Sequence, residues 1–104
     1  MCNIAGYTGT RRAAPILIEM MRKEQFYDGG QSTGLATIHE GKLYYAKVLG
    51  DLDTLLSTTD AEKLCGNAGI IHSRTPDGGD NRWSHPFVTL RDKRVKLAYV
   101  ENGS

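Results

Sequence analysis

Residues 33–49 read Thr-Gly-Leu-Ala-Thr-Ile-His-Glu-Gly-Lys-Leu-Tyr-Tyr-Ala-Lys-Val-Leu. The stretch contains two β-like runs, residues 33–39 and 42–49, which are separated by Glu40-Gly41. Two such runs joined by a short connection with glycine are typical of a β-hairpin. The middle of the chain is therefore predicted to form a pair of antiparallel strands.

The segment before this hairpin predicts a strand and a helix. Residues 3–8 read as a short strand that ends at a glycine. Residues 13–25 predict a helix, because apolar side chains recur there at helical spacing and a proline stands in the first turn. The expected core residues of this helix are Ala13, Leu17, Met20 and Met21.

The segment after the hairpin predicts short helices and two more strands. Residues 51–64 predict two short helices, the second of them capped by Thr59 or Asp60. Residues 68–73 and 94–101 have the composition of strands, and residues 76–84 form a polar, glycine-rich loop that is long enough to hold a site. The order of elements predicts an α+β layer structure.

Composition and charge exclude several classes of protein. The chain has 104 residues, which suits one small domain, and a formal net charge of +1, which does not favour nucleic acid as a partner. The basic pairs at residues 11–12 and 91–94 are expected in solvated turns. No apolar run approaches the roughly 20 residues of a membrane span. With two cysteines and no zinc-type spacing, we expect a cytoplasmic protein with reduced thiols and without a metal or cofactor.

Five residues are of types suited to acyl transfer. Cys2 would become the first residue if Met1 were removed, and its own α-amine could then act as the base for its thiol. Arg74 follows a predicted strand and could hold a carboxylate, while His85 precedes a proline in a loop. The amide of Asn102 and the backbone N–H of Gly103 could form an oxyanion hole. Taken singly, each position also fits an ordinary structural role. For His39 and His72, on predicted strands, we expect packing.

Five segments in order resemble class II glutamine amidotransferases. Residues 1–7 (Met-Cys-Asn-Ile-Ala-Gly-Tyr) resemble the family's Cys-Gly-Ile-x-Gly-Tyr, and residues 27–36 its Tyr-Arg-Gly-Tyr-Asp-Ser-Ala-Gly-Ile-Ala. Residues 69–74 (Gly-Ile-Ile-His-Ser-Arg) are similar to Gly-Ile-Gly-His-Thr-Arg. Residues 84–87 resemble Ala-His-Pro-Phe, and residues 100–103 resemble Val-His-Asn-Gly. The glutaminase domain of glucosamine-6-phosphate synthase is the most similar branch.

The resemblance implies a fold, a reaction and a set of roles. The family fold is the α-β-β-α sandwich of N-terminal-nucleophile hydrolases, and residues 1–104 would form only its N-terminal half. By this resemblance Cys2 attacks the side-chain amide of glutamine, Asn102 and Gly103 hold the oxyanion, and Arg74, Thr75 and His85 bind the substrate. The ammonia would pass to a C-terminal synthase domain outside this chain. An incomplete sandwich would expose an apolar face, so we expect association with a second copy.

The chain departs from the family pattern at three places, which keeps two alternatives open. Asn3 replaces a glycine, Asp28 replaces an arginine, and residues 75–79 replace Trp-Ala-Thr-His-Gly. One alternative is an inactive relic or regulatory module of the same fold. The other is a cysteine-type N-terminal-nucleophile hydrolase that acts on a different amide.

Overall fold

The computed structural model describes residues 2–24, 30–74, 85–91 and 94–100. Its helices and strands follow the order β1 (Asn3–Thr8), α1 (Ala13–Glu24), β2 (Ser32–His39), β3 (Lys42–Leu49), α2 (Leu52–Thr58), η1 (Ala61–Lys63), β4 (Ala68–Arg74), β5 (Phe87–Arg91) and β6 (Arg94–Tyr99). The predictions of β1, of the hairpin β2–β3 and of β4 are confirmed to within one residue. The predicted loop at residues 76–84 lies outside the described residues.

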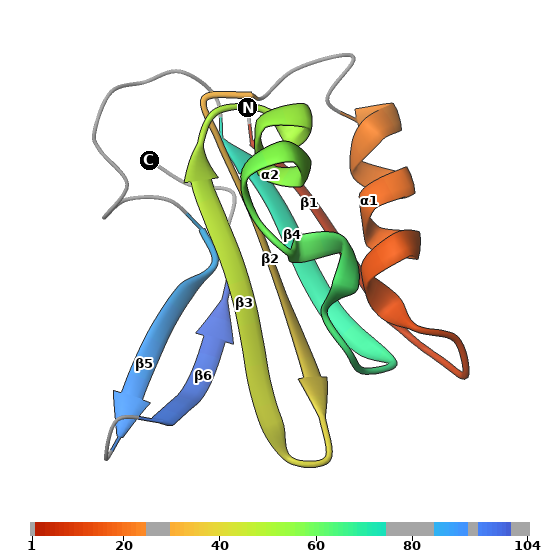
Figure 1. Ribbon diagram of the computed structural model, residues 1–104, viewed down its shortest axis with the longest axis vertical. Helices are drawn as coiled ribbons and strands as arrows, with labels where there is room; N and C mark the ends of the chain where they lie inside the picture. The colour runs from red at the N-terminus through yellow and green to blue at the C-terminus, as the bar shows by residue number, and fades with distance from the viewer. Residues whose placement is uncertain (1, 25–29, 75–84, 92–93, 101–104) are drawn as a thin grey trace.

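The strands form two antiparallel sheets, in agreement with the predicted α+β class. Four strands pair in the order β1-β4-β2-β3, and β5 pairs with β6 in a separate two-stranded sheet. Helices α1 and α2 lie on one face of the larger sheet, as Figure 1 shows, and the β5–β6 hairpin lies beside β3. No helix in the described ranges is long and apolar enough to cross a membrane.

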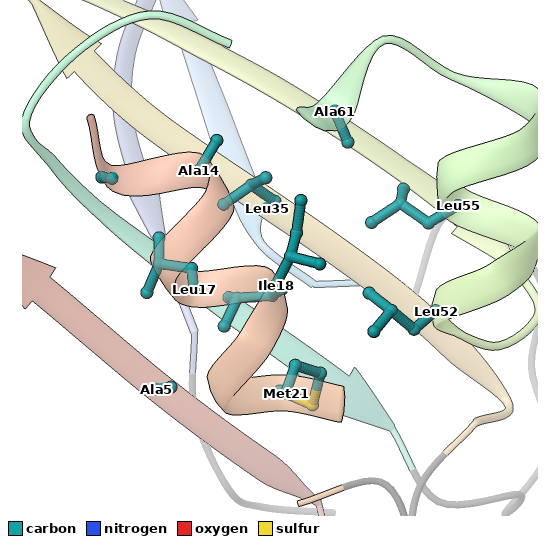
Figure 2. Close-up of a cluster of buried hydrophobic side chains, with 11 residues drawn as sticks. Ala5, Ala14, Leu17, Ile18, Met21, Leu35, Leu52, Leu55 and Ala61 are labelled. Carbon is teal, nitrogen blue, oxygen red and sulfur yellow. The ribbon is translucent and has the colours of Figure 1, made fainter. Parts of the chain in front are cut away.

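The hydrophobic core lies between the helices and the larger sheet. Leu17, Ile18 and Met21 of α1 meet Leu52 and Leu55 of α2 above the strands, as Figure 2 shows. The sheet contributes side chains from three adjacent strands, namely Ala5, Ile71 and Leu35. Each fully buried large aliphatic side chain in such a core stabilises the fold by about 1.5–3 kcal/mol.

Helix α1 turns to the core nearly the side that its spacing predicted, with one exception. Met21 is fully buried as predicted, but Met20 is 37% exposed, and Ile18 takes the predicted place of Met20 in the core. Leu17, Ile18 and Met21 lie on one side of a helix, whereas Met20 falls at the rim of that stripe. The core prediction for Met20 was therefore wrong.

The segment after the hairpin forms one α-helix and one short 3-10 turn. The carboxylate of Asp51 accepts a hydrogen bond from the N–H of Thr54 at 2.9 Å and so caps α2. The 3-10 turn η1 begins after Asp60, and the hydroxyl of Thr59 accepts from the N–H of Ala61 at 3.2 Å. Both residues predicted to cap the second helix thus lie at its start, and only Thr59 makes the side-chain bond.

One strand was missed, and two further predictions were corrected. Strand β5 was not predicted, and β6 ends at Tyr99 rather than reaching residue 101, which lies outside the described residues. His39 was expected to pack, but its side chain is 46% exposed because it stands at the last position of β2, beside the turn. His72, in contrast, is fully buried, as predicted.

Candidate active site

Four chain segments meet at one end of the larger sheet. Asn3 at the start of β1 lies opposite Ser73, and Ser32 at the start of β2 lies opposite both Arg74 and Leu49. This is the upper end of the sheet in Figure 1, where the N-terminus is marked. Cys2 directly precedes Asn3, so this half-buried residue lies beside the end of β4.

The pairing register also decides which side chains share a face. Ile4, His72, Gly34 and Lys47 lie directly opposite one another across the four strands. Residues that are directly opposite share a face, and successive residues alternate between faces. This row therefore lies on the face away from the helices, and alternation along β1 puts Cys2 on that face too.

Asn3, which stands where the resembling family has glycine, faces the other way. Its side-chain amide donates a hydrogen bond to the carbonyl of Glu24 at 3.3 Å, the last residue of α1. The bond ties the start of β1 to the end of the helix. The substitution thus adds a contact on the helix side and leaves the face that carries Cys2 unobstructed by the Asn3 side chain.

A group of buried hydroxyls fixes the chain where it enters β2. The hydroxyl of Ser73 accepts from the N–H of Gly30 at 2.8 Å, and the hydroxyl of Thr33 donates to the carbonyl of Gly50 at 2.9 Å. The two hydroxyls are 3.5 Å apart, and both residues are fully buried. Hydrogen bonds shielded from water hold geometry more firmly than exposed ones. They therefore hold the ends of β2, β3 and β4 in a fixed arrangement.

The backbone of β4 is held in the same way at the arginine. The carbonyl of Arg74 accepts from the N–H of Gln31 at 2.9 Å, and the carbonyl of Gln31 accepts from the N–H of Gly50 at 2.8 Å. Arg74 itself is half-buried at this end of the sheet. The backbone of Arg74 is thus held by the residue before β2, which is itself held by the residue after β3.

His85 lies over the face that carries the row of Ile4 and His72. Its ring stacks on that of His72 with centroids 3.9 Å apart and an interplanar angle of 13°. The Nζ of Lys47 donates to the carbonyl of Pro86 at 3.3 Å, and burial lowers the pKa of Lys47 below its ordinary value. The predicted site residue His85 is therefore held against the sheet through side chains of β4 and β3.

The structure brings together three of the six predicted site residues at one end of one sheet. Cys2 and Arg74 lie at the ends of neighbouring strands, and His85 covers the adjoining row. Thr75, Asn102 and Gly103 lie outside the described residues. Sequence reasoning missed Gly34, Lys47 and the stacking role of His72, because their partners are distant in sequence and no local pattern marks them.

One hollow on the surface of the described residues lies apart from this site. An open depression of about 590 Å³ lies at the opposite end of the sheet, where Arg11, His39 and Cys65 line it, and it contains none of the predicted site residues. Within the described ranges, no group of three His, Cys, Asp or Glu side chains is arranged to hold a metal ion.

Comparison with known proteins gives a consistent set of relatives. Over 99% of its length the chain is 35% identical to the glutamine–fructose-6-phosphate aminotransferase (isomerizing) of Pyrococcus horikoshii, 36% identical to that of Thermosynechococcus vestitus and 38% identical to that of Bartonella henselae. It spans only 16–17% of the length of these relatives. No protein-family model matches the chain.

The matched region extends along nearly the whole chain, so it includes the segments that form the site end of the sheet as well as the helices behind it. The relatives are enzymes by name, and the class II glutamine amidotransferase domain is their N-terminal part. The predicted resemblance is therefore confirmed: the chain is homologous to the class II glutamine amidotransferase domain of these aminotransferases.

Proposed function

We propose that the chain forms the nucleophile-bearing part of a glutaminase domain that releases ammonia from glutamine. The observation that carries the proposal is the convergence of Cys2, Arg74 and His85 on one end and one face of a sheet. A thiol can attack the amide of a substrate, a guanidinium can bind its carboxylate, and an imidazole can line the pocket. The homology to glutamine–fructose-6-phosphate aminotransferases supports the same reaction.

The reaction begins at the thiol of Cys2 after removal of Met1. The α-amine of Cys2 takes the thiol proton, and the sulfur attacks the side-chain carbonyl carbon of glutamine. The C–N bond breaks, the proton passes to the leaving nitrogen, and ammonia departs from a γ-glutamyl thioester. Water then attacks the thioester, which releases glutamate and restores the thiol.

The substrate is oriented by the groups beside the thiol. Arg74 binds the α-carboxylate of glutamine through paired hydrogen bonds, and Thr75 and His85 line the pocket. Asn102 and Gly103 donate hydrogen bonds to the oxyanion. The half-buried position of Arg74 supports its role, because a guanidinium shielded from water binds a carboxylate more strongly than an exposed one.

The proposed fold is one half of an α-β-β-α sandwich, with residues 1–104 forming part of one amidotransferase domain. Helices α1 and α2 would be one outer layer, and β5–β6 the beginning of the second sheet. Among the described residues, four large apolar side chains are exposed on the sheet face away from the helices: Ile4, Ile38, Tyr45 and Leu49. More of a second sheet, or a second copy of the chain, would cover them.

The acceptor of the ammonia is proposed from the names of the relatives. Their names describe aminotransferases that act on glutamine and fructose 6-phosphate, and they are about six times as long as this chain. A C-terminal synthase domain in the same longer protein would accept the ammonia.

The test is the intact mass of the purified chain before and after treatment with a diazoketone analogue of glutamine. We expect loss of Met1 and one adduct per chain on Cys2. The chain has two cysteines, so Cys65, at the opposite end of the sheet, provides the matched control. Cys2→Ser should abolish the adduct and Cys65→Ser should retain it.

The same experiment separates the alternatives. Retention of Met1 without any adduct would overturn the proposal and favour an inactive relic or regulatory module. An adduct on Cys2 from a simple alkylating agent, without one from the glutamine analogue, would instead favour a hydrolase of a different amide. Equal labelling of Cys2 and Cys65 would show general thiol reactivity and no glutamine pocket.

A further inference from the structure

Three rings pack in a row on the face of the sheet that carries Cys2; two of them are stacked and the third is tilted. His72 of β4 is fully buried, and His85 is 7% exposed. Their rings are nearly parallel, at 13° and 3.9 Å between centroids, and the ring of Phe87 lies 4.2 Å from that of His85 at 41°. A buried stack of two imidazoles is an uncommon way to fill a core, since aliphatic side chains fill space without polar atoms.

The strand that neighbours His72 is shaped to receive the backbone of His85. Gly34 lies directly opposite His72 on β2, and a Cβ at this position would lie 1.8 Å from the carbonyl oxygen of His85 and 2.7 Å from the Cδ of Pro86. The missing side chain lets the backbone rest directly on β2. The ring of His85 then reaches the ring of His72 on the next strand.

The third strand of the row holds the same segment from its other side. Lys47 lies opposite Gly34 on β3, and its Nζ donates to the carbonyl of Pro86 at 3.3 Å. Three adjacent strands thus bind two residues, through a ring on β4, a gap on β2 and an ammonium group on β3. This arrangement leaves little freedom for His85 to turn or slide.

We infer that His72 is a positioning residue of the glutamine site, whose ring holds His85 face to face and so sets the direction in which the edge of the His85 imidazole points. The inference rests on the proposed function. Because His72 covers one face of the His85 ring, His85 meets a substrate through its ring edge, where both nitrogens lie. Ile4, two residues after Cys2, lies directly opposite His72, so the same row joins the nucleophile's strand to the stack.

The inference assigns the positioning role to the ring face of His72 and not to its nitrogens. Two substitutions test this distinction. His72→Phe retains a flat ring for His85 to stack on but removes both nitrogens. His72→Gln retains a polar side chain but removes the ring. If stacking is what positions His85, the Phe variant keeps the site and the Gln variant loses it.

Histidine ring NMR spectra report the stack directly. The chain has three histidines, and His39 is exposed near the far end of the sheet, so its signals serve as an internal reference. Ring protons of His85 should be shifted upfield by the His72 ring, and His85→Gln assigns them. The upfield shift should persist in His72→Phe and disappear in His72→Gln, while the His39 signals stay unchanged in both.

The alkylation of Cys2 by the diazoketone reports the functional consequence. For His72→Gln we expect the half-saturating concentration of the analogue to rise about 10-fold to 100-fold, which is the range that a displaced positioning group produces. The rate at saturation should change far less, because the thiol and its amine are untouched. His72→Phe should stay near the wild-type values, and His39→Gln is the matched control.

The outcomes separate this inference from the proposed function. No adduct in the wild-type chain overturns the proposed function and, with it, any role of His72 in glutamine binding. An adduct whose kinetics are the same in His72→Gln and wild type overturns the inference alone. Equal losses in the Phe and Gln variants also overturn it, since the nitrogens would then matter rather than the ring. If His72→Gln does not fold, Gly34→Ala displaces His85 from β2 without altering His72, and the same two readouts apply.

Discussion

The contact between Gly34 and His85 gives the most sharply defined prediction, for the substitution Gly34→Ala. The added methyl group would lie 1.8 Å from the carbonyl oxygen and 2.8 Å from the carbonyl carbon of His85. Non-bonded heavy atoms of this kind rest about 3.5 Å apart, so the His85 segment must withdraw by roughly 1.5 Å. The closest atom is a backbone oxygen, and the next, the Cδ of Pro86 at 2.7 Å, belongs to a proline ring, so no side-chain rotation relieves the clash.

The expected cost combines overpacking with loss of the stack. Extra methyl groups in a packed interior destabilise proteins by about 1–3 kcal/mol, and a stacked aromatic pair contributes about 0.5–1.5 kcal/mol beyond its buried area. We therefore expect Gly34→Ala to lower the free energy of unfolding by about 2–4 kcal/mol. For a domain of this size the midpoint of thermal unfolding should fall by at least about 8 °C.

Thermal and urea unfolding followed by far-UV circular dichroism provide the assay, with Gly6→Ala as the matched control. Gly6 lies on the same face in β1, and there the nearest heavy atom to an added Cβ is the carbonyl oxygen of Gly69 at 3.8 Å, an ordinary contact. The control should be as stable as wild type or slightly more stable. If Gly34→Ala matched Gly6→Ala in stability and kept the upfield His85 signals, the proposed close approach would be wrong.

Four further substitutions test other parts of the structure. Ser73→Ala removes the acceptor of the buried Gly30 N–H and should cost about 1–3 kcal/mol in urea unfolding; a loss below 0.5 kcal/mol, on the order of a surface substitution, would argue against that hydrogen bond. Leu17→Ala should cost about 2–5 kcal/mol because the side chain is fully buried, whereas Met20→Ala, at 37% exposure, should cost far less, and equal costs would contradict the observed helix orientation. Asp51→Ala should cost about 0.5–1 kcal/mol at pH 7, at the low end for a cap because the carboxylate is exposed. Hydrogen bonds from Thr54 hold the pKa of Asp51 below its ordinary 3.8. The difference in unfolding free energy between wild type and Asp51→Ala should therefore be complete above pH 4 and shrink as the pH falls through that lowered pKa. A difference independent of pH would exclude a charged cap.

Local order along the chain accounts for most of the elements that were predicted correctly. The strand pair of residues 33–49 was predicted from two β-like runs and the turn residues between them. The helix that begins at residue 13 was predicted from apolar spacing and a proline in its first turn. All of these features act within a few residues. The strand at residues 87–91 was missed because it is only five residues long and adjoins a charged stretch that reads as a turn. Its identity depends on pairing with β6, which lies later in the chain.

The features of the candidate site also fall into those that the sequence predicted and those that it did not. Cys2, Arg74 and His85 were predicted because five sequence segments resemble one family, and a resemblance of this kind needs no three-dimensional information. The orientation of Asn3 toward α1, the exposure of Met20 and His39, and the buried hydroxyls of Thr33 and Ser73 were not predicted. Each depends on which face of an element another element covers.

The amino-acid sequence by itself determined the kinds of elements, their approximate ends, the family and the identity of the proposed nucleophile, because these depend on neighbouring residues or on ordered motifs. Only the tertiary structure decided that Gly34 and His72 form the surface on which His85 rests. The physical reason is that the contact joins three segments, on β2, β4 and the approach to β5, whose strand order and register place them together. No local preference of any one segment specifies the distance between a missing side chain and a distant carbonyl group.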